Sequence, residues 1–235
     1  IALDAYTGEP KWRFYAGGGI IANPASANGK LFFNTIEGQF HCLDVQTGRL
    51  LWRYTTSGQG IGSPTVSDGI VYFGSGFPNY NIYAIDAETG SWLWQYYTAQ
   101  PPNSTPAVAG RVVWTGAGDG AWHGLDAVTG APVAKLQTEG FMYLSSAAIL
   151  DDAVFAAGGE NDRNVYAFNA KDGAPLWTAA PAAADDIVKL SSFAAHNGRV
   201  FVSAGYPEQK LFALDAGNGL TLWSQALGDA SNHNT

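Results

Sequence analysis

Three observations predict that this chain is all-β and folds as a β-propeller of four-stranded antiparallel blades. A short motif of the form Asp-x-x-Thr-Gly recurs about every forty residues. Between its copies lie short runs of β-branched and aromatic residues bounded by Gly, Asn or Asp. No long segment has a convincing helical period, which excludes the helix-pair repeats of similar length. Units of this size that must stack to bury their faces are typical of propeller blades.

The motif occurs six times, and its later copies drift from the first. The first three copies run over residues 4–12, 44–52 and 86–94, and each ends in tryptophan. The fourth copy has Ala134 where that tryptophan should be. The motif glycines are Gly8, Gly48, Gly90, Gly130, Gly173 and Gly219. Their even spacing predicts one blade per copy.

Each repeat has room for four short strands. In the second full repeat we expect them at residues 64–66, 70–74, 81–85 and 93–96. The middle two are almost continuously apolar, which indicates burial on both faces.

Each motif is expected to form a turn and to join neighbouring blades. The Asp side chain can hydrogen-bond its own turn, and the glycine can take positive φ without strain. The tryptophan ring then packs on the adjacent blade, burial worth about 2 kcal/mol or more. The residues expected in this structural docking role are Asp4, Gly8, Trp12, Asp44, Gly48, Trp52, Asp86, Gly90, Trp94, Gly173, Trp177, Asp215, Gly219 and Trp223.

The pattern Ala-x-Asp-x-x-x-Gly-x-x-x-Trp, seen at residues 2–12 and 84–94, resembles the tryptophan-docking motif of pyrroloquinoline-quinone-like (PQQ-like) propeller repeats. The resemblance covers essentially the whole chain. That family includes quinoprotein alcohol dehydrogenases, usually eight-bladed, and cofactor-free propellers such as the lipoprotein subunit of the outer-membrane β-barrel assembly machinery. The resemblance implies a periplasmic or extracellular location.

The repeat phase predicts a single propeller domain or segment with partial blades at its ends. We expect a partial blade at 1–16, complete blades at 17–59, 60–101, 102–139, 140–180 and 181–227, and a stub at 228–235. The expected architecture is an arc of a seven- or eight-bladed propeller. The alternatives are a six-bladed ring closed with difficulty and a five-bladed ring with a spare strand.

Composition excludes several functional classes. The formal net charge of −8 argues against a nucleic-acid partner, because such binding depends on Lys and Arg neutralising phosphates. No apolar run is long enough to span a membrane. The lone Cys42 excludes an intrachain disulfide and a cysteine-based metal site.

The sequence nominates no catalytic, cofactor-binding or metal-binding residue. In the resemblance, the quinone is clamped between a tryptophan and a disulfide of neighbouring cysteines beside a calcium or lanthanide ion, and this segment has no such cysteine pair. Acidic loops at 160–162 and 185–186 lack the spacing of a calcium loop. PQQ with calcium is therefore expected only in a longer protein whose other blades supply the clamp.

Aromatic residues in loops on one face of the blades suggest a protein partner, although some can simply pack over the blade tops. The expected interaction face comprises Phe77, Tyr80, Phe141, Tyr143 and Tyr206. We therefore expect a non-catalytic, extracytoplasmic scaffold for protein interactions. The alternatives are the propeller domain of a quinone-cofactor-dependent alcohol or sugar dehydrogenase, with its clamp outside this segment, and an accessory domain of a larger assembly.

Overall fold

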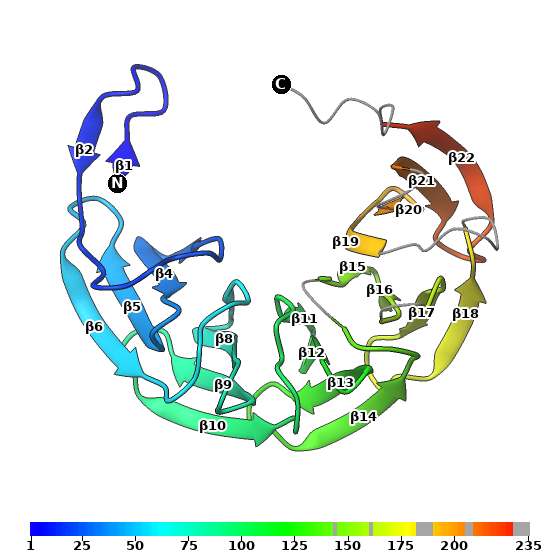
Figure 1. The fold of residues 1–235 in the computed structure, drawn as a ribbon, viewed down its shortest axis with the longest axis horizontal. Helices are drawn as coiled ribbons and strands as arrows, with labels where there is room; N and C mark the ends of the chain where they lie inside the picture. Colours follow the sequence, from blue (N-terminus) through cyan, green and yellow to red (C-terminus); the bar gives the residue numbers. More distant parts are fainter. Residues whose placement is uncertain (143–144, 160–161, 182–189, 205–208, 228–235) are drawn as a thin grey trace. The chain divides into compact units, whose positions relative to one another are not determined.

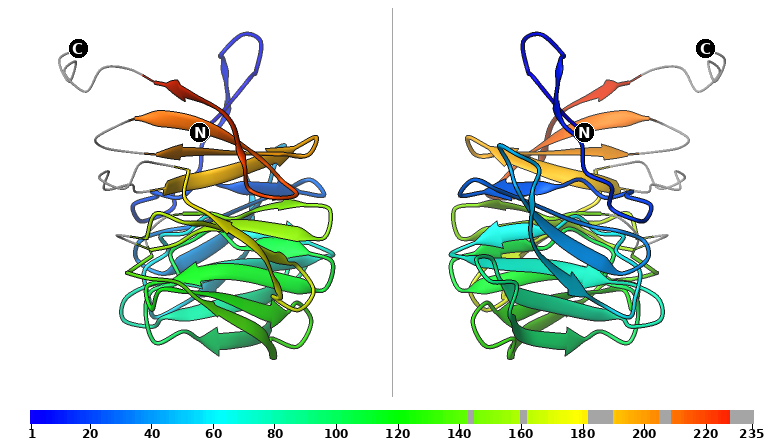
Figure 2. Two further views of the ribbon diagram at one scale, coloured as in Figure 1. Left: turned by 90° about the vertical axis from the view of Figure 1, so that its right-hand side faces the viewer. Right: turned by 90° about the vertical axis from the view of Figure 1, so that its left-hand side faces the viewer.

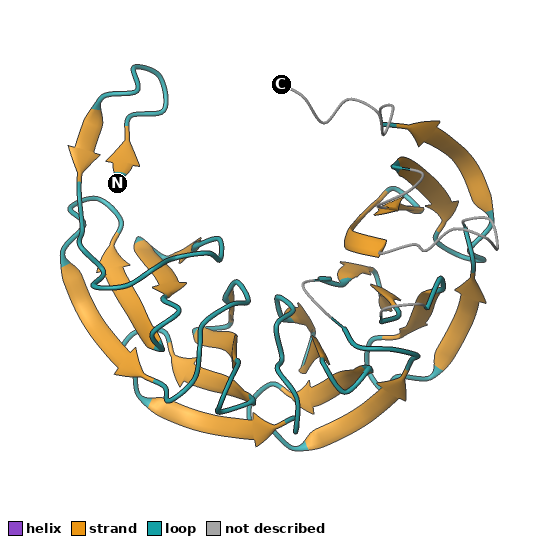
Figure 3. Cartoon of the chain, in the orientation of Figure 1, coloured by secondary structure: helices purple, strands orange, loops and turns teal. Residues whose placement is uncertain are grey.

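A computed structural model describes residues 1–142, 145–159, 162–181, 190–204 and 209–227, which form two compact units, residues 1–102 and 103–235. Figure 1 labels the strands, and Figure 3 shows strands and loops without a helix in the described residues. Within those residues there is accordingly no helix suited to crossing a lipid bilayer. The all-β prediction is confirmed.

The first unit contains one two-stranded and two four-stranded antiparallel sheets. The two-stranded sheet is formed by β1 (Ala2–Leu3) and β2 (Pro10–Trp12). The next sheet consists of β3 (Ala25–Ala27), β4 (Lys30–Asn34), β5 (Gln39–Asp44) and β6 (Leu50–Thr55). The third consists of β7 (Thr65–Ser67), β8 (Ile70–Ser75), β9 (Asn81–Asp86) and β10 (Trp92–Tyr97).

The second unit contains three four-stranded antiparallel sheets. The first consists of β11 (Ala107–Ala109), β12 (Val112–Ala117), β13 (Ala121–Asp126) and β14 (Pro132–Gln137). The next consists of β15 (Ala148–Leu150), β16 (Ala153–Ala157), β17 (Val165–Asn169) and β18 (Pro175–Ala179). The last consists of β19 (Leu190–His196), β20 (Arg199–Ala204), β21 (Lys210–Asp215) and β22 (Thr221–Ala226).

Within every four-stranded sheet each strand pairs with the next along the chain, as expected for propeller blades. The strands of one sheet are rotated relative to one another, which Figure 2 shows in side view. In each sheet the register shifts where the last strand begins, for example between Cys42 and Leu43. Such an irregularity bends the outer strand and redirects its side chains. The blade boundaries in residue numbers stay a prediction.

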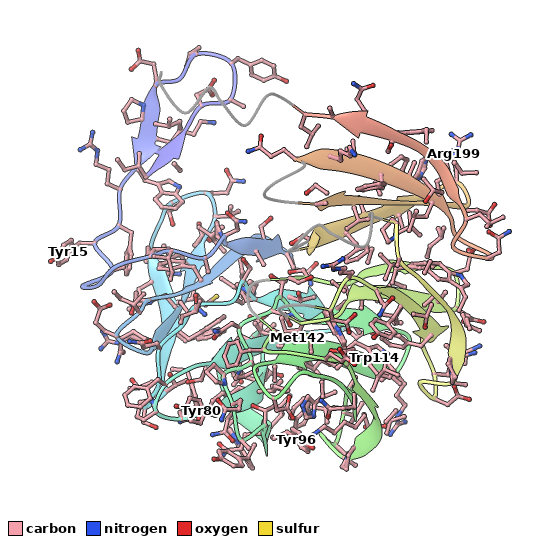
Figure 4. The ribbon with its side chains drawn as sticks, turned by 45° about the vertical axis from the view of Figure 1, so that its right-hand side comes forward. Tyr15, Tyr80, Tyr96, Trp114, Met142 and Arg199 are labelled. Carbon is pink, nitrogen blue, oxygen red and sulfur yellow. The ribbon has the colours of Figure 1, made fainter. Side chains whose placement is uncertain are left out.

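The core of each unit lies between neighbouring sheets. In the first unit, Phe40 of β5 stacks on Phe73 of β8 with ring centroids 4.2 Å apart. In the second unit, Trp114 and Met142 belong to one buried cluster between the β11–β14 and β15–β18 sheets, and Figure 4 labels both. The middle strands are buried almost throughout, as their apolar sequences predict.

Candidate functional site

The Asp-x-x-Thr-Gly motif forms the turn between the third and fourth strands of a sheet. The Asp44 carboxylate accepts hydrogen bonds from the Gln46 amide and from both the amide and the hydroxyl of Thr47, the latter two at 2.8 Å. The Gly48 amide donates to the Asp44 carbonyl, and Gly48 has a φ of 70°. The Thr47 hydrogen bonds hold the pKa of Asp44 below its ordinary value.

In the first unit, two motif tryptophans hydrogen-bond the main chain of the following sheet. The Trp12 indole donates to the Val45 carbonyl at 3.0 Å, and the Trp52 indole donates to the Ala87 carbonyl at 3.2 Å. The Trp52 ring lies directly over Gly90, where an added Cβ would come within 2.7 Å of it. The motif glycine therefore provides the flat surface on which the ring of the preceding sheet rests.

The second unit repeats this contact between its last two sheets. The Trp177 indole donates to the Ala216 carbonyl at 2.9 Å, and its ring covers Gly219. Trp94 is buried, with 5% of its surface exposed, whereas Trp223 on β22 is 43% exposed. The other predicted docking positions, at Asp4, Gly8, Asp86, Gly173 and Asp215, all lie in motif turns.

The sheet that lacks a motif tryptophan uses another tryptophan instead. Trp114, on the second strand of its sheet, is fully buried and donates from its indole to the Ala170 carbonyl at 2.8 Å. Its ring reaches Gly173, the motif glycine of the next sheet. This contact was not predicted from the sequence, because it depends on which residues of adjacent strands lie opposite one another.

The strand register explains how Trp114 reaches that position. Trp114 lies opposite Gly124, which lies opposite Ala134. An added Cβ at Gly124 would come within 2.6 Å of the Trp114 ring. The corresponding trio in the next sheet is Phe155, Ala167 and Trp177, so the tryptophan lies on the second strand in one sheet and on the fourth strand in the other.

Polar contacts also join neighbouring sheets within each unit. In the first unit, the Lys30 ammonium group bonds Glu88 at 2.7 Å, and the Asn23 amide donates to the Ser63 hydroxyl at 3.0 Å. In the second unit, the Thr105 amide donates to the Ser146 hydroxyl at 3.3 Å. The Glu88 hydrogen bond raises the pKa of Lys30. These inner hydroxyls therefore help to join sheets.

A charged cluster that includes the buried His123 lies at the β12–β13 turn. Asp119 is 3.2 Å from His123 Nε2 and accepts a hydrogen bond from Lys135 at 2.8 Å. Burial raises the pKa of Asp119, but hydrogen bonds from Lys135 and His123 outweigh it, and the pKa lies below its ordinary value. Burial lowers the pKa of His123 more than Asp119 raises it, so the pKa lies below its ordinary value. The cluster secures the turn.

The described residues contain no group of three His, Cys, Asp or Glu side chains that could hold a metal ion. Asp162, from one acidic loop considered above, accepts hydrogen bonds from the Glu139 amide, the Tyr166 hydroxyl and the Asn164 amide groups. Residues 160–161 and 185–186 lie outside the described residues. Burial raises the pKa of the Cys42 thiol to about 12, which makes the thiol unreactive in the folded protein.

Two residues of the expected interaction face lie on the β8–β9 loop of the first unit. Phe77 is 62% exposed and Tyr80 is partly buried, with ring centroids 6.2 Å apart. Tyr97, at the end of β10, is also 62% exposed, and the following residue, Thr98, donates to the Tyr80 carbonyl. We call Phe77, Tyr80 and Tyr97 the aromatic face. Sequence reasoning missed Tyr97 because it lies within a strand.

Of the other expected residues, Phe141 is partly buried, and Tyr143 and Tyr206 lie outside the described residues. Met142, beside Phe141, is 2% exposed and packs in the core of the second unit. The segment of Phe141 and Met142 therefore contributes partly to the core of the second unit.

Comparison with known proteins identifies the fold. A family model described as outer membrane protein assembly factor BamB matches residues 1–160 and 78–235. No curated protein sequence matches the chain significantly.

Several solved structures share the fold at low sequence identity. BamB from Moraxella catarrhalis is 22% identical, with a TM-score of 0.78 over 96% of this chain and 66% of that one. A europium-containing methanol dehydrogenase is 13% identical, with a TM-score of 0.77 over 92% of this chain and 53% of the other. The quinohemoprotein alcohol dehydrogenase ADHIIG from Pseudomonas putida HK5 is 17% identical, with a TM-score of 0.71 over 92% and 43%. The chain thus spans less than two thirds of the length of these proteins.

These likenesses confirm the β-propeller fold and the resemblance found in the sequence. Since the two matched ranges together cover the whole chain, the protein belongs to the PQQ-like β-propeller family described as outer membrane protein assembly factor BamB.

Proposed function

We propose that this chain is a non-catalytic propeller module that binds a protein partner in an extracytoplasmic compartment. The observation that carries the proposal is the aromatic face, where Phe77 and Tyr97 each leave 62% of their surface exposed. The match to a family described as an assembly factor supports a binding role over a catalytic one.

The aromatic face is held in place by hydrogen bonds between the β8–β9 loop and neighbouring segments of the first unit. The Phe77 carbonyl accepts from the Gln59 amide at 3.0 Å, and the Tyr80 carbonyl accepts from Thr98. The Asn79 side chain donates to Ser57. Rigid aromatic side chains lose little entropy on binding, and burying one stabilises a complex by about 1.5–3 kcal/mol.

Site-specific photo-crosslinking in the native cell tests this proposal. A photo-reactive phenylalanine analogue is placed at Phe77, at Tyr97 or at Tyr6 of the full-length protein. Tyr6 is the matched control, because it is aromatic and 99% exposed but lies in the turn between β1 and β2. We expect positions 77 and 97 to crosslink the same protein, identified by mass spectrometry, and position 6 not to do so.

Substitution then tests whether the crosslink reports binding. Phe77→Ala should remove the crosslink from position 97 without changing the stability of the fold, because Phe77 is exposed. Crosslinking of position 6 to the same protein with equal yield, or a crosslink from position 97 that survives Phe77→Ala, would argue against an aromatic docking site.

The extracytoplasmic location has its own test. Fractionation of cells that make the full-length protein should place it outside the cytoplasm. Recovery with a cytoplasmic marker would overturn that part of the proposal alone.

The second candidate is the propeller domain of a quinone-dependent dehydrogenase. It is favoured by the likeness to the europium-containing methanol dehydrogenase. The described residues do not supply a fitting site, since they contain no cluster of metal-ligating side chains and Cys42 is their one cysteine. Reconstitution of the full-length protein with PQQ and calcium decides the matter: alcohol-dependent dye reduction would establish the enzyme, and its absence in a correctly folded protein would exclude it.

A further inference from the structure

A groove of about 550 Å³ opens in the second unit between the β11–β14 and β15–β18 sheets. Its floor is aliphatic and consists of Val108, Val112, Val133 and Ile149. Its volume is in the range of pockets that bind small molecules or short peptide segments. It is a separate feature from the aromatic face, which belongs to the first unit.

Side chains that join the two sheets at the corresponding position of the first unit are replaced in the second unit. Between the β3–β6 and β7–β10 sheets, the Trp52 indole donates to the Ala87 carbonyl, and Lys30 pairs with Glu88. The strand register equates Trp52 with Ala134, and Lys30 with Val112.

Glu88 follows Ala87, whose amide donates to the Gly69 carbonyl in the β7–β8 hairpin. In the second unit, the Ala170 amide donates to the Asp152 carbonyl in the equivalent β15–β16 hairpin. Lys171, which follows Ala170, therefore takes the place of Glu88. Trp114 restores the hydrogen bond to Ala170 from the second strand, and neither Trp114 nor Ala134 lines the groove. The Lys30–Glu88 ion pair of the first unit is therefore replaced by an aliphatic residue and a cation, Val112 and Lys171, and both line the groove.

The rim of the groove is charged, and its carboxylates outnumber its cations. Arg111 pairs with Asp126, and the Asp126 carboxylate also accepts hydrogen bonds from the Val128 and Thr129 amides of the motif turn. Lys171 pairs with Asp152 at 2.8 Å, and about 70% of each side chain is exposed. Asp151 is exposed, and among the described residues its carboxylate has no hydrogen bond or ion pair. One carboxylate at the rim is therefore available to a ligand.

We propose that this groove binds an extended segment of a partner protein that combines large aliphatic side chains with lysine or arginine. The aliphatic side chain occupies the floor, and the basic group pairs with Asp151. The net charge of −8 on the whole chain favours approach of a basic segment over an acidic one. The proposal does not depend on the aromatic face.

The probe is a fluorescein-labelled hexapeptide of alternating lysine and leucine, titrated into the protein by fluorescence anisotropy. Two comparison peptides replace every lysine by glutamate or every leucine by serine. We expect the lysine–leucine peptide to bind most tightly and to shift the NMR amide signals of Val108, Val112 and Ile149. Tighter binding of the glutamate peptide would overturn the charge assignment.

Two variants locate the site. Val112→Lys with Lys171→Glu rebuilds the ion pair that closes the first unit, and it should weaken binding at least about tenfold by filling the groove. Asp151→Asn should weaken binding about two- to fivefold, the range of an exposed ion pair. Asparagine suits this turn, because Asn28 and Asn197 hold the same positive φ in equivalent hairpins.

Asp68→Asn is the matched control, because Asp68 occupies the equivalent hairpin of the first unit with a φ of 49°. It should leave the affinity unchanged. Equal weakening by Asp68→Asn and Asp151→Asn would assign the binding to diffuse negative charge and overturn the proposal. Undiminished binding by the folded Val112→Lys/Lys171→Glu protein would do the same. If that double variant does not fold, the two asparagine variants still decide the question.

Discussion

The trio of Trp114, Gly124 and Ala134 predicts a strong coupling among three substitutions. Trp114→Phe alone should destabilise the second unit. Adding Gly124→Ala and Ala134→Trp should restore most of the lost stability, because the triple variant then carries the arrangement seen at Phe155 and its strand partners.

The size of the effect follows from burial and hydrogen bonding. Trp114 is fully buried, and its indole donates to the Ala170 carbonyl. Losing that hydrogen bond costs about 0.5–1.5 kcal/mol. Trimming the ring to phenylalanine costs about a third of a complete truncation, or about 1–1.5 kcal/mol. Trp114→Phe should therefore lower the free energy of unfolding by about 1.5–3 kcal/mol.

The single substitution Gly124→Ala should also destabilise. Its Cβ would come within 2.6 Å of the Trp114 ring, and overpacking of this kind costs about 1–3 kcal/mol. The same substitution should cost little once Trp114 is phenylalanine. The triple variant should lie within about 1 kcal/mol of the parent.

Urea unfolding followed by far-UV circular dichroism provides the free energies, because tryptophan fluorescence changes with the substitutions themselves. Hydrogen exchange of the β12 and β13 amides assigns the change to the second unit. Additive free energies for Trp114→Phe and Gly124→Ala, or a triple variant less stable than Trp114→Phe alone, would refute the reasoning that Trp114 replaces the missing motif tryptophan.

Three further predictions concern the turns and the core. Gly90→Ala should destabilise the protein by about 2–4 kcal/mol, because it combines a φ of 73° with a Cβ 2.7 Å from the Trp52 ring. Gly69→Ala is the control: its Cβ meets no atom within 4 Å, and it should cost only about 1 kcal/mol. Urea unfolding compares the two variants. Hydrogen bonds from the motif turn lower the pKa of Asp86 below 3.8. The stabilisation by the Asp86 carboxylate is therefore present above about pH 4 and is lost as the pH falls through the folded-state pKa. Asp86→Asn should reduce the acid sensitivity of the melting temperature. Cys42, with a pKa of about 12, should not react with a thiol reagent at pH 8 until urea unfolds the chain, and rapid labelling of the folded protein would contradict its burial.

The repeat made most of the fold predictable from the sequence. The motif glycines set the period, and short apolar runs bounded by turn residues marked the strands around them. The Asp side chain and the glycine of each motif are local signals, because both act within a few residues of chain.

The role of Trp114 could not be predicted in the same way. Trp114, Gly124 and Ala134 are ten residues apart in sequence, and only the register of three strands brings them into one row. The unusual glycine within a strand was the available signal, since such a residue often marks a close approach by another group. The exposure of Phe77 and the burial of Met142 likewise depend on the packing of loops, which residue type does not determine.

The hydrogen bonds made by the tryptophans have a consequence for how such repeats change over time. Their acceptors are main-chain carbonyls, here at Val45, Ala87, Ala170 and Ala216. Every residue type carries that carbonyl, so a substitution at the acceptor leaves the bond intact. A duplicated or transplanted repeat can therefore join a new neighbour without a matching mutation in it, which allows blade number and surface chemistry to diverge while the joints are kept.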